Sequence, residues 1–219
     1  MSSRFAPKAI VFDLDGTLVD SAGDIVAALD GLLVESGRRA VGYAAGRAMI
    51  GDGARVLIER GFAATGGPVA DADKALKRWF EIYSADIARH SKPYPGVRET
   101  LADLGGRGLA LAVCTNKADA PSRLLLETLD LAAPFRVVVG GDVAHRKPDP
   151  RHLLDTLAKL GAAPKDALMV GDSPNDAKAA RAAGVPVVIV DYGYSHIPPH
   201  ELGADAVISD FSDLRKLVA

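Results

Sequence analysis

The sequence is poor in several features that would assign it to a particular class of protein. It has one cysteine, Cys114, in 219 residues, which excludes an internal disulfide bond and a zinc site built from cysteines. Aromatic residues make up only 5%, and 26 basic residues nearly balance 28 acidic ones, with no run of like charge. We therefore expect no partner that requires a basic surface, such as nucleic acid or an anionic membrane.

Long apolar runs are absent as well. No stretch approaches the roughly 20 apolar residues that cross a bilayer, and MSSRFAPK at the start lacks the apolar core of a secretory signal. These absences predict a cytoplasmic protein. The hydrophobic share of 48% is enough for a sizeable core, in one large domain or in a core domain that carries a smaller one.

What the sequence does contain is a series of short apolar runs separated by segments with helical spacing. Because the runs show no polar alternation, they predict parallel strands that are buried on both faces. The predicted strands are Ala9–Phe12, Leu109–Cys114, Arg136–Gly140, Ala167–Gly171, Pro186–Val190 and Asp205–Ile208. The alternation of strands and helices from Lys92 onward predicts an α/β fold.

The interval from Ala22 to Ala88 breaks this alternation, since it carries several helical patterns and no convincing strand. It predicts a helical insertion after the first strand, and SKPYPG at residues 91–96 predicts the linker that returns to the core. We therefore expect a Rossmann-like parallel-sheet core of residues 1–18 and 92–219. A small, all-helical cap domain of residues 19–91 is inserted into it.

Polar side chains follow the predicted strands, at the edge where parallel α/β sheets bind their ligands. The residues concerned are Asp13, Asp15, Thr115, Asn116, Lys147, Asp172 and Asp176. Four carboxylates that face one lysine repel one another strongly at reduced dielectric, so a cation is needed. Mg²⁺ suits such a site, because it takes oxygen ligands and leaves room for water and a phosphate.

Each of these segments also has a simpler explanation when it is taken alone. DGT is common in turns and helix caps, and TNK would serve as an N-cap. KPDP would order a loop that leads into a helix with Pro150 in its first turn, and GDSPND is typical loop chemistry. Their joint occurrence, in order, at strand ends that share one sheet edge favours a functional site.

Four of these segments resemble the sequence motifs of the haloacid dehalogenase-like phosphohydrolases. They are DLDGTLVDS, VCTNK, RKPDP and GDSPND. The resemblance spans nearly the whole chain, because the helical insertion is similar to the small mobile cap of that superfamily. Within the superfamily, four further segments resemble the phosphoglycolate phosphatases, namely MIGDGARVLIER, YPGVRETLADL, VCTNK and DYGYS.

The resemblance implies a role for each motif residue. Asp13 would attack phosphorus and form an aspartyl-phosphate, and Asp15, crowded by its neighbour, would act as general acid and base. Mg²⁺ would be held by Asp13, the backbone carbonyl of Asp15, and Asp172. Lys147 and Thr115 would bind the transferring group, with Asn116 in support. Asp176 would orient Lys147 or a metal-bound water.

The cap would then select the substrate, for which 2-phosphoglycolate is the first candidate. In the cap we expect the segment Gly51, Asp52, Gly53 and Arg55 to meet the carboxylate of the substrate, since a helix N-terminus suits an anion. An i,i+4 pair of Arg55 with Glu59 on a solvated helix face is an equally good interpretation.

Other functions remain open at this point. Within the superfamily these are phosphatases for a sugar phosphate, an amino-sugar phosphate or pyrophosphate, and a phosphosugar mutase; outside it, a receiver-like phospho-acceptor module is a weaker candidate. The oligomeric state, monomer or homodimer, is not readable. The five histidines show no metal-ligand spacing and are expected on the surface or in loops. Cys114 is expected to be a buried hydrophobe, and Trp79, Phe80 and Tyr83 are expected in the cap core.

Overall fold

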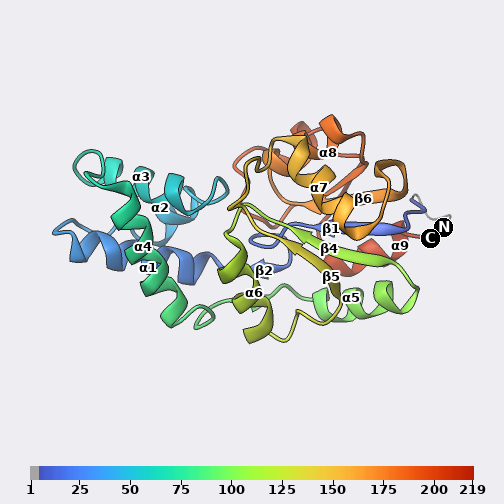
Figure 1. Cartoon of the computed structure of the whole chain (residues 1–219), viewed down its shortest axis with the longest axis horizontal. Helices are drawn as coiled ribbons and strands as arrows, with labels where there is room; N and C mark the ends of the chain where they lie inside the picture. Colours follow the sequence, from blue (N-terminus) through green and yellow to red (C-terminus); the bar gives the residue numbers. More distant parts are fainter. Residues whose placement is uncertain (1–4) are drawn as a thin grey trace.

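A computed structural model describes residues 5–219. A parallel sheet of six strands, in the order β5-β4-β1-β6-β7-β8, forms its centre (Figure 1). The strands are β1 (Ala9–Phe12), β4 (Ala110–Cys114), β5 (Phe135–Val139), β6 (Ala167–Gly171), β7 (Val187–Val190) and β8 (Ala206–Ile208). Every pairing in this sheet is parallel. The predicted α/β class is therefore confirmed, and all six strands lie within one residue of the predicted bounds.

Helices cover both faces of the sheet. On one face, α7 (Pro150–Leu160) and α8 (Pro174–Ala183) pack against alternate strand residues such as Val11 and Met169. The opposite face, which includes Ile10 and Phe12, is covered by α5 (Val97–Gly106), α6 (Asp119–Thr128) and α9 (Leu214–Leu217) (Figure 1). Two buried faces explain why the strands lack polar alternation.

A lobe of four helices lies beside the carboxyl edge of the sheet (Figure 1). We call it the helical lobe; it comprises α1 (Ala22–Glu35), α2 (Tyr43–Arg47), α3 (Ala54–Ala64) and α4 (Ala72–Ala85). Its core contains Trp79 and Tyr83, whose rings stack with centroids 4.8 Å apart. A division into a core of residues 1–18 and 92–219 and a cap of residues 19–91 stays a proposal, and residues 1–4 lie outside the described residues.

The chain enters and leaves the helical lobe through a short two-stranded antiparallel sheet that the sequence did not predict. β2 (Val19–Asp20) leads into α1, and β3 (Lys92–Pro93) lies in the segment expected to be the return linker. Next to it, the buried carboxylate of Asp24 accepts hydrogen bonds from the backbone N–H groups of His90 and Ser91 and from the Ser91 hydroxyl. One side chain therefore ties together the two places where the chain crosses.

Candidate active site

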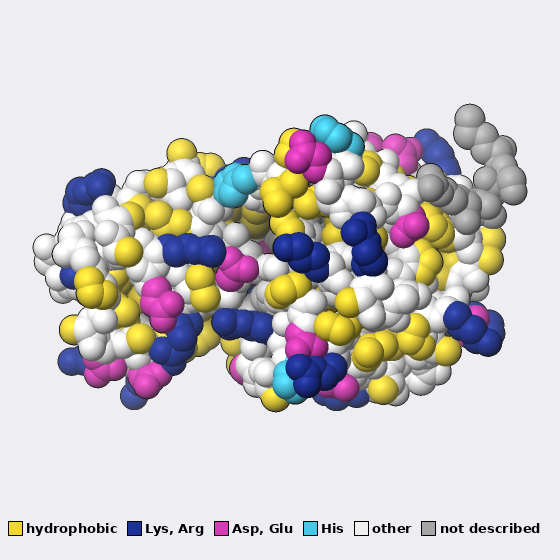
Figure 2. Space-filling model, turned by 90° about the horizontal axis from the view of Figure 1, so that it is seen from above, with side chains coloured by type: hydrophobic (Ala, Val, Ile, Leu, Met, Phe, Trp, Pro, Cys, Tyr) yellow, Lys and Arg dark blue, Asp and Glu magenta, His cyan; other side chains and the backbone are white. Residues whose placement is uncertain are grey.

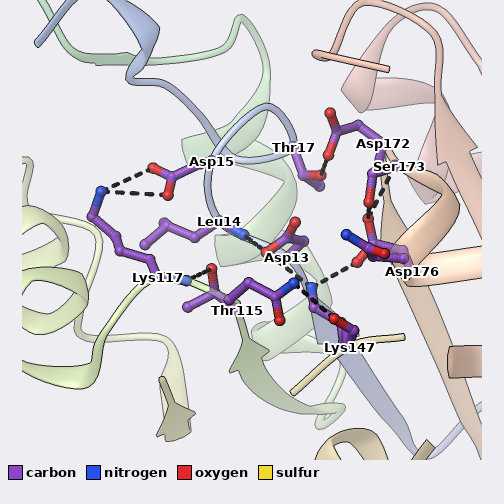
Figure 3. A network of polar contacts seen from close by, with 12 residues as sticks. Asp13, Leu14, Asp15, Thr17, Thr115, Lys117, Lys147, Asp172, Ser173 and Asp176 are labelled. Atoms are coloured by element: carbon purple, nitrogen blue, oxygen red, sulfur yellow. Dashed lines mark hydrogen bonds and ion pairs between the residues drawn. The ribbon is translucent and has the colours of Figure 1, made fainter. Parts of the chain in front are cut away.

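The carboxyl ends of β1, β4 and β6 meet in the middle of the sheet, because β1 lies between β4 and β6. Such a change of direction in the strand order is where open α/β sheets bind ligands. The core residues expected from the sequence gather there, and Figure 3 shows six of them around one centre. They are Asp13, Asp15, Thr115, Lys147, Asp172 and Asp176.

Asp13 and Lys147 form the centre of this group. The Lys147 side chain is 1% exposed, and its ammonium lies 3.0 Å from Asp13 Oδ1, which also accepts a hydrogen bond from the Leu14 N–H. Burial raises the pKa of Asp13 to about 6, with a further contribution from Asp176, although Lys147 opposes the shift. Burial alone would lower the pKa of Lys147, but the facing carboxylates raise it above its ordinary value, so it stays charged.

Asp176 holds Lys147 in place. It lies in the first turn of α8, where its Oδ2 accepts hydrogen bonds from the backbone N–H groups of Asp172 and Ser173 and from the Ser173 hydroxyl. Its Oδ1 accepts from Lys147 at 2.6 Å. Of the two roles left open for Asp176, these contacts support the one that orients Lys147.

Asp172 follows β6 and is fixed by the chain around it. Its Oδ1 accepts from the Thr17 hydroxyl at 3.2 Å, and its Oδ2 accepts from the Tyr194 N–H at 2.6 Å. A Cβ added at Gly16 would lie 2.5 Å from Asp172 Oδ2, so the absence of a side chain there lets the first loop approach this carboxylate. Burial raises the pKa of Asp172 well above its ordinary value, and Asp176 and Asp13 add to the shift.

The donor set fits a hard divalent cation. Carboxylate oxygens of Asp13, Asp172 and Asp176 lie within 4.8 Å of one another in the described chain. Asp176 is already occupied by four donors. Asp13 and Asp172 are therefore the carboxylates with room for a cation, and their raised pKa values show that the protein alone does not compensate both charges.

Asp15 stands two positions after Asp13 in the sequence, but its carboxylate points the other way, toward Lys117 (Figure 3). The Lys117 ammonium is 3.3 Å from both Asp15 oxygens, and the Ser21 hydroxyl donates to Asp15 Oδ1 at 2.5 Å. Lys117 also donates to the Tyr83 hydroxyl of α4 at 2.7 Å. In this structure Asp15 therefore faces a cation, and the carboxylates whose pKa is raised by neighbouring carboxylates are those of Asp13 and Asp172.

Thr115 and Asn116 complete the floor of the site. Thr115 is 2% exposed, and its Oγ1 accepts a hydrogen bond from the Lys117 N–H at 3.2 Å. Asn116 donates from Nδ2 to the carbonyls of Lys147 and Gly51, at 2.9 and 3.1 Å. Asn116 therefore links the core of the site to the helical lobe.

The lobe segment expected to face the substrate does lie over the site. The Gly51 carbonyl also accepts from Asn175 Nδ2, which donates to Asp52 Oδ1 at 2.9 Å. Gly51 and Gly53 have φ values of 128° and 87°, which side chains rarely adopt. Partial burial works against ionisation of Asp52, but hydrogen bonds from Asn175 and Arg60 hold its pKa below the ordinary value.

Arg55 is the exception among the lobe residues. Its guanidinium pairs with Asp73 at the start of α4, on an exposed surface, and among the described residues it is not part of the cavity lining. Its expected contact with the substrate therefore has no support in this geometry. Its ion-pair partner is Asp73, and Glu59 adds only a weaker electrostatic attraction. Arg60, which pairs with Asp52 at 2.5 Å, is the α3 guanidinium that lines the cavity.

A cavity of about 320 Å³ lies between the helical lobe and the carboxyl edge of the sheet. Figure 2 shows the waist between the two parts, with basic and acidic side chains interspersed over this face. From the core, the lining includes Asp13, Asp15, Thr115, Asn116, Lys117, Asp172 and Tyr194. From the lobe, it includes Gly51, Asp52, Gly53, Leu57, Arg60 and Trp79. The cavity is large enough for a small ligand that both parts contact.

Several residues of the site were not predicted from the sequence. Lys117 stands in the TNK motif but had no assigned role, and Tyr83 was expected only to fill the lobe core. Tyr194 lies in DYGYS, a segment that was noted only for its resemblance to the phosphoglycolate phosphatases. The expectation for the histidines is wrong for His152, which is 1% exposed in α7; its Nδ1 accepts from the Lys147 N–H, and burial lowers its pKa to about 4.

The fold and this site define a class of enzyme. The sequence profile described as "Haloacid dehalogenase-like hydrolase" matches residues 10–190, and the chain belongs to this family. Within the described residues, no helix is long and apolar enough to cross a membrane.

More particular similarities come from individual proteins. The phosphoglycolate phosphatase of Rhodospirillum rubrum is 48% identical over 215 residues, covering 95% of this chain and 89% of the relative. That of Caulobacter vibrioides is 47% identical over 211 residues, covering 94% and 89%. The crystal structure of a "predicted phosphoglycolate phosphatase" from Haemophilus somnus superposes with a TM-score of 0.92 at 32% identity, covering 99% of each chain.

Proposed function

We propose that the protein is a Mg²⁺-dependent phosphatase that hydrolyses 2-phosphoglycolate to glycolate and phosphate. The observation that carries the proposal is the pair of buried carboxylates, Asp13 and Asp172, in the lining of a cavity that the helical lobe covers, with the buried Lys147 ammonium 3.0 Å from Asp13. The choice of substrate is supported by the relatives named phosphoglycolate phosphatase, at 47–48% identity over nearly the whole chain.

Asp13 is the proposed nucleophile. Its carboxylate oxygen forms a bond to phosphorus while the bond from phosphorus to the ester oxygen breaks, which divides one difficult displacement into two easier ones. Asp15 gives a proton to the leaving alkoxide and then takes one from the water that hydrolyses the aspartyl-phosphate. Lys147 and Thr115 hold the oxygens of the transferring group, where the negative charge of the transition state is spread.

Mg²⁺ would be held by the carboxylates of Asp13 and Asp172 and by the backbone carbonyl of Asp15. When bound, the ion supplies the positive charge that lets an ionised carboxylate approach an anionic phosphate. Lys147 would supply a second positive charge near the phosphate. Asp176 keeps it in position, since Asp176 Oδ1 lies 2.6 Å from the Lys147 ammonium.

The far end of the substrate would lie against the helical lobe. 2-Phosphoglycolate carries a carboxylate, and the lobe offers Arg60 beside the loop from Gly51 to Gly53 in the cavity lining. We assign the contact with the substrate carboxylate to Arg60 and not to Arg55, because of these two arginines only Arg60 belongs to the cavity lining in the described chain. The physiological setting that we propose is the cytoplasm, with a small phosphoester as the partner.

Phosphate release from a panel of esters tests the proposal. The panel contains 2-phosphoglycolate, a sugar phosphate, an amino-sugar phosphate and pyrophosphate, each assayed with MgCl₂ and with a chelator. We expect the highest kcat/KM for 2-phosphoglycolate and loss of activity with the chelator. A higher kcat/KM for another ester would overturn the substrate, and phosphate release that survives chelation would overturn the metal. No release from any ester would favour a phospho-acceptor module.

A further inference from the structure

Tyr194 connects the proposed metal site with the start of the helical lobe. It lies in the loop after β7 and is 5% exposed. Its backbone N–H donates to Asp172 Oδ2 at 2.6 Å, while its side chain reaches to the point where α1 begins. The two ends of one residue therefore touch a proposed metal ligand and the entry of the chain into the lobe.

The phenolic hydroxyl is fully used at that entry. It accepts hydrogen bonds from the N–H groups of Ser21 and Ala22, at 2.7 and 3.0 Å, and it donates to Asp20 Oδ1 at 3.0 Å. A phenol has one donor and two acceptor positions, and these contacts match all three. The Tyr94 side chain is a further polar neighbour of this hydroxyl. The first N–H groups of a helix need partners from outside it. For α1, whose N-cap Ser21 makes no side-chain cap bond within the described residues, Tyr194 is such a partner.

The surroundings leave this connection little freedom. A Cβ added at Gly193 would lie 2.2 Å from Asp172 Cβ, so the backbone before Tyr194 lies directly against the proposed metal ligand. Arg47 of α2 lies 5.0 Å from the centre of the Tyr194 ring and donates to the Gly193 carbonyl. Arg47 of the helical lobe therefore contacts both Gly193 and Tyr194, the two residues that lie against Asp172.

The entry of the chain is also close to the proposed acid and base, because the Ser21 hydroxyl donates to Asp15. We propose that Tyr194 is a positioning residue that couples the occupancy of the metal site at Asp172 to the start of α1 and, through Ser21, to Asp15. A cation that fixes Asp172 then also fixes the loop at Tyr194 and stabilises the first turn of α1. By linkage, a fixed first turn favours the cation in equal measure. The inference rests on the proposed function only in taking Asp172 as a metal ligand.

Hydrogen exchange of one amide tests this coupling. The Ile25 N–H donates to the Ser21 carbonyl at 3.2 Å, so its exchange reports opening of the first turn of α1. We expect Mg²⁺ to slow this exchange in the wild type by about fivefold or more. Tyr194→Phe keeps the ring and the backbone N–H to Asp172 but loses the hydroxyl. We expect it to bind Mg²⁺ by calorimetry while the exchange rate of Ile25 no longer responds.

Tyr192→Phe is the matched control, because it also removes a phenolic hydroxyl from the loop after β7. The Tyr192 hydroxyl donates to the Thr17 carbonyl and makes no hydrogen bond to the start of α1 in the described chain. It should keep the wild-type response of Ile25. If exchange in Tyr194→Phe is faster but still slows by the wild-type factor on Mg²⁺ addition, Tyr194 has a structural role alone and the proposal is wrong. Mg²⁺ binding to the wild type with no response of Ile25 also overturns this proposal alone, whereas no Mg²⁺ binding at all overturns the metal site as well.

Discussion

At the scale of single residues, Asp13 and Asp172 are carboxylates whose charges the protein compensates only in part. Burial raises the pKa of both, and the Lys147 ammonium that contacts Asp13 is shared with Asp176. A site with this imbalance binds protons in the absence of a metal ion and releases them when a cation binds.

Metal binding should therefore depend on pH. The pKa of Asp13 rises from 3.8 to about 6 on folding, so between these values the metal-free folded protein holds a proton that the unfolded chain releases. Asp13 thus contributes less stability as the pH rises through this window. Because Mg²⁺ needs the ionised form, we expect MgCl₂ to raise Tm more at about pH 7.5 than at about pH 5.

The comparison should be made with and without MgCl₂ at each pH. His152, whose pKa burial lowers to about 4, titrates in the same window with the opposite sign, and its contribution cancels when the pH is held fixed. An equal rise in Tm at both pH values would contradict the account.

The site residues that were predicted from the sequence and those that were missed are brought into the site by different parts of the structure. Asp13, Asp172 and Lys147 follow strands of one parallel sheet, so the α/β pattern alone brings them together. Lys117 depends on Tyr83, 34 positions earlier in the lobe, and a lysine after a strand usually indicates a solvated charge. Its environment follows from how the lobe packs on the core, which periodicity does not reveal.

At the scale of elements, α3 directs one arginine toward the cavity and another toward the outer surface. Arg55 and Arg60 are five positions apart, which separates them by about 140° around the helix axis. Arg60 consequently lines the cavity, whereas Arg55 pairs with Asp73 on the outside. The sequence predicted a helix here and an anion site at its start, but it could not show which side of the helix faces the core.

This division predicts different effects of two matched substitutions. We expect Arg60→Ala to raise KM for 2-phosphoglycolate by about tenfold or more, as befits the loss of a charged hydrogen bond. Arg55→Ala should change KM less than about twofold, because the exposed pair with Asp73 contributes little. Steady-state kinetics of both variants check this, and the reverse order of effects would assign the substrate contact to Arg55.

The strands also differ in how far they could be predicted from the sequence. The six strands of the central sheet were predicted because apolar runs buried on both faces carry a strong signal. β2 and β3 have two residues each, and their pairing depends on the chain entering and leaving the lobe side by side. A segment that short has no periodicity to detect.

At the scale of the whole molecule, the helical lobe is attached to the sheet through two adjacent crossings. Asp24 joins them, since it is 4% exposed and accepts from both N–H groups at the return crossing, His90 and Ser91. The sequence indicated the insertion and its linker but not this contact, because one aspartate within a helical pattern has no distinguishing feature.

Loss of this carboxylate should destabilise the protein. We expect Asp24→Ala to lower the free energy of unfolding by about 2–4 kcal/mol, because three donors in a buried position lose their acceptor. Asp86→Ala in the same lobe is the control. Its carboxylate is exposed and pairs only loosely with Arg89, at 3.6 Å, so a change within about 0.5 kcal/mol is expected. Urea unfolding measures both, and equal effects would show that the Asp24 contact is not a structural tie.

The central claim is that phosphorus passes from the substrate to Asp13. Turnover of 2-phosphoglycolate with MgCl₂ can be stopped by acid and the acyl phosphate reduced with borohydride, which converts the phosphorylated aspartate to homoserine. Peptide mass spectrometry then locates the modified residue. The account predicts homoserine at position 13 in the wild type and none in Asp13→Asn. Phosphate release without modification at position 13, or modification of another carboxylate such as Asp15, would contradict it.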